Sequence, residues 1–397
     1  MKKIYADNAA TTPMSETAKK VMVDIMENNF GNASSIHEFG RQAASVLQKS
    51  REIMAEYINA AESREIYFTS CGSESDNQAV MTAVKHGAKK NKKHIISSKI
   101  EHHAILTMLE KLAKDGFEVT FLEVGKTGLV NPKDVADAIR ADTALVTIMY
   151  ANNEIGTIQP VKEIGRVCKD KKVLFHTDAV QAGGHINIDV KECGIDMLSL
   201  SAHKFNGPKG VGILYCNKNI IPESLIFGGS HERNRRAGTE NIPGIASMAA
   251  AFEENCINLR EHAEYTSKLR DKLIAGLSKI PNSVVNGDLI NRLPNNVNMC
   301  FEGVEGESLL LMLDMKGIAV SSGSACTSGS LDPSHVLLAL GLPHEVAHGS
   351  LRLSLSHYNT EEEVDYIIET VPSVVNQLRN MSPVWEKIVK GEEKSKL

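Results

Sequence analysis

The chain has 397 residues, a formal net charge of −5, 23% charged residues and 42% hydrophobic residues. This length exceeds one typical hydrophobic core, so we expect two domains in an ordinary globular protein. The acidic balance argues against a nucleic-acid-binding protein. Residues 1–7 include lysines but no apolar run follows them, which predicts neither a signal peptide nor a membrane span.

Strand-like apolar runs alternate with helix-like stretches between about residues 60 and 216. This alternation predicts an α/β fold with a mostly parallel seven-stranded sheet that is covered by helices on both faces. Ligands bind such sheets at the carboxyl ends of the strands, where most of the motifs below occur. The expected strands are 65–69, 94–98, 118–124, 144–150, 173–178, 197–201 and 211–216, and the expected helices are 74–86, 104–114, 132–140 and 161–169.

The C-terminal part begins with a long helical pattern from Asn241 to about Ile280, which is long enough to bridge two domains. Strands at 296–301 and 350–356 and helices at 307–315, 333–340 and 360–379 predict a smaller α+β domain. We therefore expect a large domain over residues 14–260 and a small domain made of 1–13 and 261–397. The charged end, 387–397, is expected to fray.

The cysteines are odd in number, and no two of them form a Cys-x-x-Cys pair. This pattern argues against a disulfide framework and against a zinc site of paired cysteines, so we expect no metal and a cytoplasmic protein. Those at 168, 216, 256 and 300 lie in or beside apolar runs and are expected to be small buried hydrophobes. The seven are Cys71, Cys168, Cys193, Cys216, Cys256, Cys300 and Cys326.

Cys326 stands in a run of small residues, 321–329. Small polar residues and glycines cannot pack a core, so the run is expected to form a mobile surface loop. A cysteine on such a loop is reachable, and a reactive thiol must be reachable. A flexible loop that happens to hold a cysteine is the alternative, and it is the better one until Lys204 is considered.

Two predicted strands end in side chains that carry chemistry. Lys204 follows strand 197–201, where partial desolvation would let a lysine lose its proton and form a Schiff base. Asp178 ends strand 173–178, where a carboxylate could keep the ring nitrogen of pyridoxal phosphate protonated. Gln181 could donate a hydrogen bond to the phenolic oxygen of that cofactor. A solvated lysine and a helix N-cap aspartate are the alternatives.

Residues 68–77 have the pattern of a strand, a small-residue turn and the start of a helix. Backbone N–H groups and the helix dipole make such a turn an anion site, to which Ser73 could add a hydroxyl. The turn matches neither a Walker loop nor a Gly-x-Gly-x-x-Gly loop. An ordinary capped helix start is the alternative.

Three further polar residues lie at or beside predicted strands. His102 follows strand 94–98 and could stack on a planar ring or shuttle protons. Asn153 follows strand 144–150 and could contact the cofactor or a substrate carboxylate. Arg352 lies in an apolar strand, where a buried guanidinium needs an anion such as a substrate carboxylate. A histidine bonded near a helix start and an ordinary salt bridge are the alternatives for His102 and Arg352.

Taken together, an anion site, a ring acid, a stacking histidine and an amine at successive strand ends fit pyridoxal phosphate. The chain resembles the pyridoxal-phosphate-dependent cysteine desulfurases of the NifS/IscS type, which are class-V, fold-type-I enzymes. The matching segments run from 5–13 to about 382–385 and include 30–37, 152–156, 231–233 and 236–241. The cysteine run is typical of the subclass with a long, mobile loop.

The resemblance implies a role for each matching position. Lys204 would hold the cofactor covalently and later move the substrate's protons. Cys326 would attack the sulfur of the bound L-cysteine, which leaves a persulfide on the enzyme and releases alanine. The implied catalytic residues are Cys326, Lys204 and His102, the implied cofactor-binding residues are Gly72, Ser73, His102, Asn153, Asp178, Gln181, Ser201, His203, Lys204 and Thr239, and the implied substrate-binding residues are Asn153 and Arg352.

In this family the threonine that matches Thr239 reaches the phosphate of the other subunit, which implies a homodimer. The sulfur would then pass to an acceptor such as a scaffold for iron–sulfur assembly. Cys71 stands where the family often has glycine, and Ser73 stands where threonine is usual. The alternatives are a selenocysteine lyase, another class-V aminotransferase-like enzyme, which would not need Cys326, and a non-catalytic sulfur carrier, which would not need Lys204 and Asp178.

Overall fold

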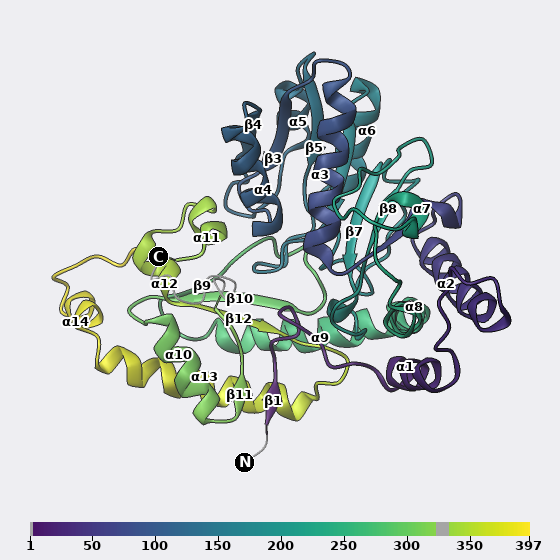
Figure 1. The fold of residues 1–397 in the computed structure, drawn as a ribbon. Coiled ribbons are helices and arrows are strands. Elements are labelled where there is room, and N and C mark those ends of the chain that lie inside the picture. The colour runs from purple at the N-terminus through teal and green to yellow at the C-terminus, as the bar shows by residue number, and fades with distance from the viewer. Residues whose placement is uncertain (1–2, 323–332) are drawn as a thin grey trace.

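The computed structural model describes residues 3–322 and 333–397, and a seven-stranded sheet lies in its upper part (Figure 1). The strand order is β2-β8-β7-β6-β5-β3-β4, and β8 is antiparallel to both of its neighbours while the other pairs are parallel. The mostly parallel sheet is as predicted. Its strands are β2 (Ile66–Thr69), β3 (His94–Ser98), β4 (Glu118–Leu122), β5 (Thr143–Thr147), β6 (Leu174–Asp178), β7 (Met197–Ser201) and β8 (Gly212–Cys216).

Successive side chains of a strand point to opposite faces of a sheet, and in this sheet helices bury both faces. Ile95 packs in an apolar cluster with α3 and α4, whereas Ile96 packs in a second cluster with α5, α6 and α8. Continuous apolar strands are therefore what this sheet requires. The helices are α3 (Gly72–Ala88), α4 (His103–Lys114), α5 (Pro132–Ala138), α6 (Val161–Lys171) and α8 (Ile242–Ile257).

The C-terminal part has its own antiparallel sheet, in the order β12-β10-β9, and its own apolar cluster. Strand β1 (Ile4–Tyr5) joins this part through parallel pairing with β11 (Ile318–Ala319). This agrees with the assignment of residues 1–13 to the smaller domain, although the domain boundaries stay a prediction. The other elements are β9 (Ser283–Val285), β10 (Asn296–Phe301), β12 (Ser350–Ser354), α9 (Leu259–Leu277), α10 (Gly306–Met315), α11 (His335–Ala339), α12 (His344–His348), α13 (Glu361–Asn380) and α14 (Pro383–Val389).

The long helix predicted from residue 241 to about 280 is in fact two helices, α8 and α9. Asn258 ends the first with a non-helical ψ of 10° and its N–H bonded to the carbonyls of Cys256 and Glu254. The chain therefore turns between a helix buried against the large sheet and one that packs on the smaller sheet. Helices α1 (Glu16–Asn28) and α2 (Glu38–Tyr57), which lie against α8, had not been predicted.

The charged end of the chain was expected to fray, but hydrogen bonds and an ion pair hold it in place. The backbone N–H of Lys396 and the hydroxyl of Ser395 both donate to the carboxylate of Glu302, at 2.7 Å each. The Lys396 ammonium also pairs with Glu345 at 2.8 Å. A charged tail is ordered here because an acidic partner lies within its reach. Within the described part of the chain, no helix combines the length and apolar character needed to cross a bilayer.

Candidate active site

A cavity of about 320 Å³ lies where the carboxyl ends of β6 and β7 meet the N-terminus of α3. Parallel strands bring their carboxyl ends to one edge of a sheet, so residues far apart in the sequence converge there. Of the twelve predicted site residues, ten line this cavity. They are Gly72, Ser73, His102, Asn153, Asp178, Gln181, Ser201, His203, Lys204 and Arg352.

The start of α3 forms the end of the cavity that suits an anion. Cys71 is the N-cap and contributes no side-chain cap, so the first backbone N–H groups of the helix keep their capacity to bind an anion. Gly72 is required by space, since a Cβ there would lie 2.8 Å from a methyl group of Val180. Burial and then the neighbouring Lys204 lower the pKa of His203 to about 4, so the imidazole is neutral at pH 7.

Lys204 lies in a 3-10 turn, Ala202–Lys204, directly after β7. Its ammonium donates to the backbone carbonyls of Ala9 at 2.6 Å and Ala10 at 2.8 Å. The amide of Gln181 donates to the same Ala9 carbonyl at 2.9 Å. The N-terminal segment thus forms one wall of the cavity, although sequence reasoning gave it no specific role.

Asp178 and His102 both line the cavity, and one donor atom of each lies within 4.8 Å of the other. Burial raises the pKa of Asp178, while the charges of His102 and Lys204 and a bond from the Val180 N–H, 2.9 Å, oppose that rise. Burial lowers the pKa of His102. His102 Nδ1 accepts the backbone N–H of Ala104 at 3.1 Å, so the neutral ring carries its proton on Nε2.

Arg352 of β12 is buried, with 3% of its side chain exposed. Its Nη2 pairs with Asp7 at 2.9 Å, and its Nη1 donates to the Asn153 carbonyl at 3.2 Å. Its Nε, which is also buried, has no partner among the described residues. The ordinary salt bridge that was the alternative is therefore present, and binding of a substrate carboxylate stays a prediction.

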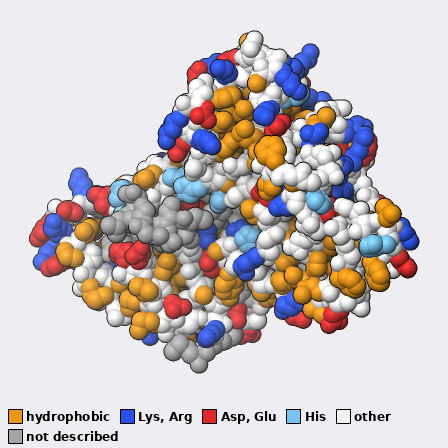
Figure 2. All heavy atoms as spheres, viewed as in Figure 1, with side chains coloured by type: hydrophobic (Ala, Val, Ile, Leu, Met, Phe, Trp, Pro, Cys, Tyr) orange, Lys and Arg blue, Asp and Glu red, His pale blue; other side chains and the backbone are white. Residues whose placement is uncertain are grey.

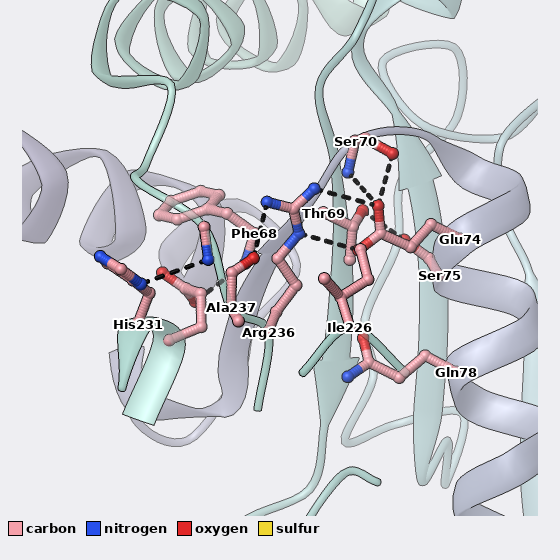
Figure 3. A network of polar contacts seen from close by, with 12 residues as sticks. Phe68, Thr69, Ser70, Glu74, Ser75, Gln78, Ile226, His231, Arg236 and Ala237 are labelled. Carbon is pink, nitrogen blue, oxygen red and sulfur yellow. Dashed lines mark hydrogen bonds and ion pairs between the residues drawn. The ribbon is translucent and has the colours of Figure 1, made fainter. Parts of the chain in front are cut away.

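Thr239 does not line the cavity, and it is exposed. Arg236 and Ala237, which lie just before it in the chain, take part in a network of polar contacts (Figure 3). Arg236 Nε donates to Glu74 at 3.0 Å, and the Gly238 N–H donates to His231 at 3.2 Å. The loop that contains Thr239 follows the short helix α7 (His231–Asn234), in which Glu232, Arg233 and Asn234 have positive φ values of 44°, 56° and 62°. Cys326 lies outside the described residues.

Of the four cysteines that were expected to be buried, three are buried. Cys168, Cys216 and Cys300 are buried, and burial raises the pKa of the Cys168 and Cys300 thiols to about 12. Cys256 was also expected to be buried but is partly exposed, because it lies in the last turn of α8, where the helix leaves the core.

A model of the family described as Aminotransferase class-V matches residues 4–367. The chain belongs to the class-V aminotransferase family. It is 53% identical to a cysteine desulfurase IscS of Methanosarcina thermophila, covering 97% of this chain and 95% of that one. It is 46% identical to the cysteine desulfurase NifS of Azotobacter vinelandii, covering 97% and 96%. A solved NifS-like protein superimposes with a TM-score of 0.88 and 38% identity, covering 94% of this chain and 100% of that one.

Family members use pyridoxal phosphate, and the cavity suits that cofactor on structural grounds. A helix start with no side-chain cap can take the phosphate, and a buried acid can face the ring nitrogen. Asp76, His102 and Asp178 each place one donor atom within 4.8 Å of the others. Such a cluster is also compatible with a metal ion, so the expectation of no metal stays untested.

Three residues near the site were not recognised from the sequence. Asp7 pairs with Arg352, while Asp76 and Glu101 are buried carboxyl groups within or beside the cavity. Glu101 accepts the Ser98 hydroxyl at 2.5 Å and the Met149 N–H, and burial raises its pKa to about 8. The sequence did offer a signal for them, since each of the three acids stands in or beside a segment that had already been singled out for other residues.

Proposed function

We propose that this protein is a cysteine desulfurase, which takes the sulfur of L-cysteine onto Cys326 as a persulfide and releases L-alanine. The observation that carries the proposal is one cavity lined by Lys204, Asp178 and His102, with Arg352 in its wall. Relatives at about half identity over nearly the whole chain are named cysteine desulfurases. The role of Cys326 in this proposal comes from the family resemblance of the sequence, because Cys326 lies outside the described residues.

The cavity residues would divide the work by their chemistry. Gly72 and Ser73 would bind the phosphate through the start of α3, with Ser201 and His203 beside them. Asp178 would keep the cofactor ring nitrogen protonated. When bound, pyridoxal phosphate supplies an electron sink for the carbon atoms of the amino acid.

The substrate's own groups would be handled by the remaining residues. Arg352 would bind the carboxylate of L-cysteine, next to Asn153. Lys204 would take the proton from Cα. The thiolate of Cys326 would attack the substrate sulfur, so that an S–S bond forms and the Cβ–S bond breaks. The released electron pair stays with the carbon skeleton, which takes up protons and leaves as alanine.

A homodimer belongs to this proposal, since Thr239 is exposed and lies away from its own cavity. Hydrophobic side chains gather at the lower right of the face in Figure 2, over α1 and α2. Phe30 and Ile36, in the segment that joins these two helices, are 74% and 92% exposed. Apolar exposure of this kind marks an interaction surface. In such a dimer Thr239 would reach the partner's phosphate site, as the family resemblance implies.

Mixed dimers test the shared site directly. Homodimers of Thr239→Ala should bind pyridoxal phosphate weakly, and homodimers of Lys204→Ala should lack turnover. A mixed dimer of the two variants carries one site with both residues intact, so it should recover about half of the wild-type activity per dimer. Absence of any recovery in a purified mixed dimer would count against a shared site.

The persulfide sulfur would go to an acceptor such as an iron–sulfur scaffold protein, and a reducing cytoplasm would suit an enzyme whose described cysteines are unpaired. The activity is tested by incubating the purified protein, loaded with pyridoxal phosphate, with L-cysteine and measuring the alanine that is released. Mass spectrometry should find one added sulfur on the peptide that holds Cys326. Formation of 3-mercaptopyruvate from L-cysteine with a keto-acid acceptor, without alanine or added sulfur, would show a transaminase instead.

A further inference from the structure

Asp76 is a buried carboxyl group in the candidate active site that the proposed function does not use. It lies in the second turn of α3, one face of which lines the cavity, and only 1% of the residue is exposed. Its Oδ1 has no hydrogen-bond partner among the described residues. A buried carboxylate is costly unless it is paired and hydrogen-bonded, so this atom needs an explanation.

The basic group nearest to Asp76 among its described contacts does not compensate a negative charge there. His176 Nε2 is 3.7 Å from Asp76 Oδ1, which is too long for a hydrogen bond. The two nitrogens of His176 already bond the hydroxyls of Ser199 at 3.0 Å and Thr147 at 2.9 Å. Burial lowers the pKa of His176 to about 3, so its ring is neutral.

The groups around Asp76 are mostly acidic or neutral, and they come from four segments. Burial is the first cause that raises the pKa of Asp76, and the charge of Asp178 is the second. A bond with Ser199 acts in the opposite direction. The titratable groups that face it are Asp178 and His176 of β6, His102 at the start of α4, Glu101 just before it, and Cys71 at the start of α3.

Asp178 differs from Asp76 in its partners. It accepts the Val180 N–H at 2.9 Å, and the charges of Lys204 and His102 favour its ionised form. One oxygen of each acid lies within 4.8 Å of the other in the same buried pocket. Two carboxyl groups that close cannot both be ionised without a large cost, so the pair keeps one proton. Asp178 carries the negative charge, because it has the hydrogen-bond donor and the positively charged neighbours that stabilise a carboxylate.

We propose that Asp76 is a positioning residue, the uncharged member of a carboxyl pair whose single negative charge is held on Asp178 opposite the cofactor ring nitrogen. This inference rests on the proposed use of pyridoxal phosphate. Asp76 acts through Asp178 and not on the substrate: its neutral form leaves the ring nitrogen with one carboxylate and spares the pocket a second buried charge.

Infrared spectroscopy of the apoprotein labelled with ¹³C-aspartate tests the protonation without any turnover. Wild type should show the carbonyl band of a protonated aspartic acid at pH 7, and Asp76→Asn should remove it. In Asp178→Asn that band should titrate away at lower pH, because the charge that holds the proton on Asp76 is gone. Asp170→Asn, an exposed control on α6, should leave the band as it is.

Cofactor binding gives the second readout. Asp76→Asn keeps the shape and the neutral state, so its affinity for pyridoxal phosphate should stay within about threefold of wild type, while Asp178→Asn should lose about tenfold or more. Asp76→Ala should be less stable than Asp76→Asn, which restores the side-chain volume.

Three results would overturn the pairing: no protonated aspartate band in wild type at pH 7, a band that titrates at the same pH in Asp178→Asn, or equal loss of cofactor affinity in the two Asn variants. The first of these needs no variant, so it stands even if Asp76→Asn fails to fold. A protein that shows the band but produces no alanine would refute the desulfurase proposal and leave the pairing intact.

Discussion

Arg352 of β12, which lines the candidate active site, forms an ion pair at 2.9 Å with Asp7 of the N-terminal segment. The two residues are 345 positions apart, and the pair ties the start of the chain to the smaller sheet. It also means that Arg352 already has a carboxylate partner before any substrate binds. A substrate carboxylate must therefore join this pair or displace Asp7.

Asp7→Asn tests that relationship. The variant leaves a buried guanidinium without its charged partner, so the free energy of unfolding should fall by about 1–3 kcal/mol. The KM for L-cysteine should stay the same or fall, because Arg352 no longer interacts with a competing charge. Arg352→Ala, by contrast, should raise the KM at least about tenfold. Equal rises in both variants, measured by steady-state alanine release, would mean that Asp7 helps to bind the substrate.

Lys204→Ala should abolish turnover. The wild-type protein should be yellow, and borohydride reduction should fix the cofactor to the peptide that contains Lys204, as peptide mapping would show. Reduction of the variant should label no peptide. A colourless wild-type protein that cannot be reconstituted with pyridoxal phosphate would contradict the assignment of the cofactor.

Asp178→Asn keeps the shape of the side chain but removes its charge. We expect a loss of about two powers of ten or more in kcat, or roughly 3 kcal/mol of barrier, since the ring nitrogen is no longer held protonated. A variant within about threefold of the wild-type rate would rule out the ring-acid role.

Cys326→Ser should keep the colour and should still bind L-cysteine, but it should release almost no alanine and carry no persulfide. Cys71→Ser is the matched control, because Cys71 also lines the cavity but lies at the anion end. It should retain most of the activity. Added sulfur on the Cys71 peptide, or normal alanine release from Cys326→Ser, would show that Cys326 is not the nucleophile.

Glu101→Gln should change the pH dependence of stability. Burial raises the pKa of Glu101 from 4.5 to about 8, so the folded protein holds a proton that the unfolded chain releases. The stability from that proton is complete below about pH 4.5 and is lost as the pH rises to about 8. Thermal unfolding of the apoprotein should therefore show the variant gaining on wild type between pH 5 and 8. Glu110→Gln, an exposed control on α4, should run parallel to wild type.

The sequence was sufficient for the strands of the large sheet and for most of the cavity. Buried parallel strands are continuously apolar, so runs such as β3 and β7 stand out, and the polar residues that follow them must meet at one edge. For that reason the sequence pattern alone places Lys204, Asp178 and His102 together. The family resemblance supplied Cys326 and Thr239, which no local pattern would have assigned to this site.

Only the tertiary structure determined which ionisable groups interact with one another. Asp7 and Arg352 are 345 residues apart, and Asp76 is 102 residues from Asp178. Ion pairing and the sharing of a proton depend on distance in space and on the exclusion of water, and neither can be predicted from the local sequence. The ordered tail on Glu302 has the same origin, because Glu302 and Lys396 are 94 positions apart in the chain. Chain order and residue type set what the site contains, and packing sets the protonation state in which it works.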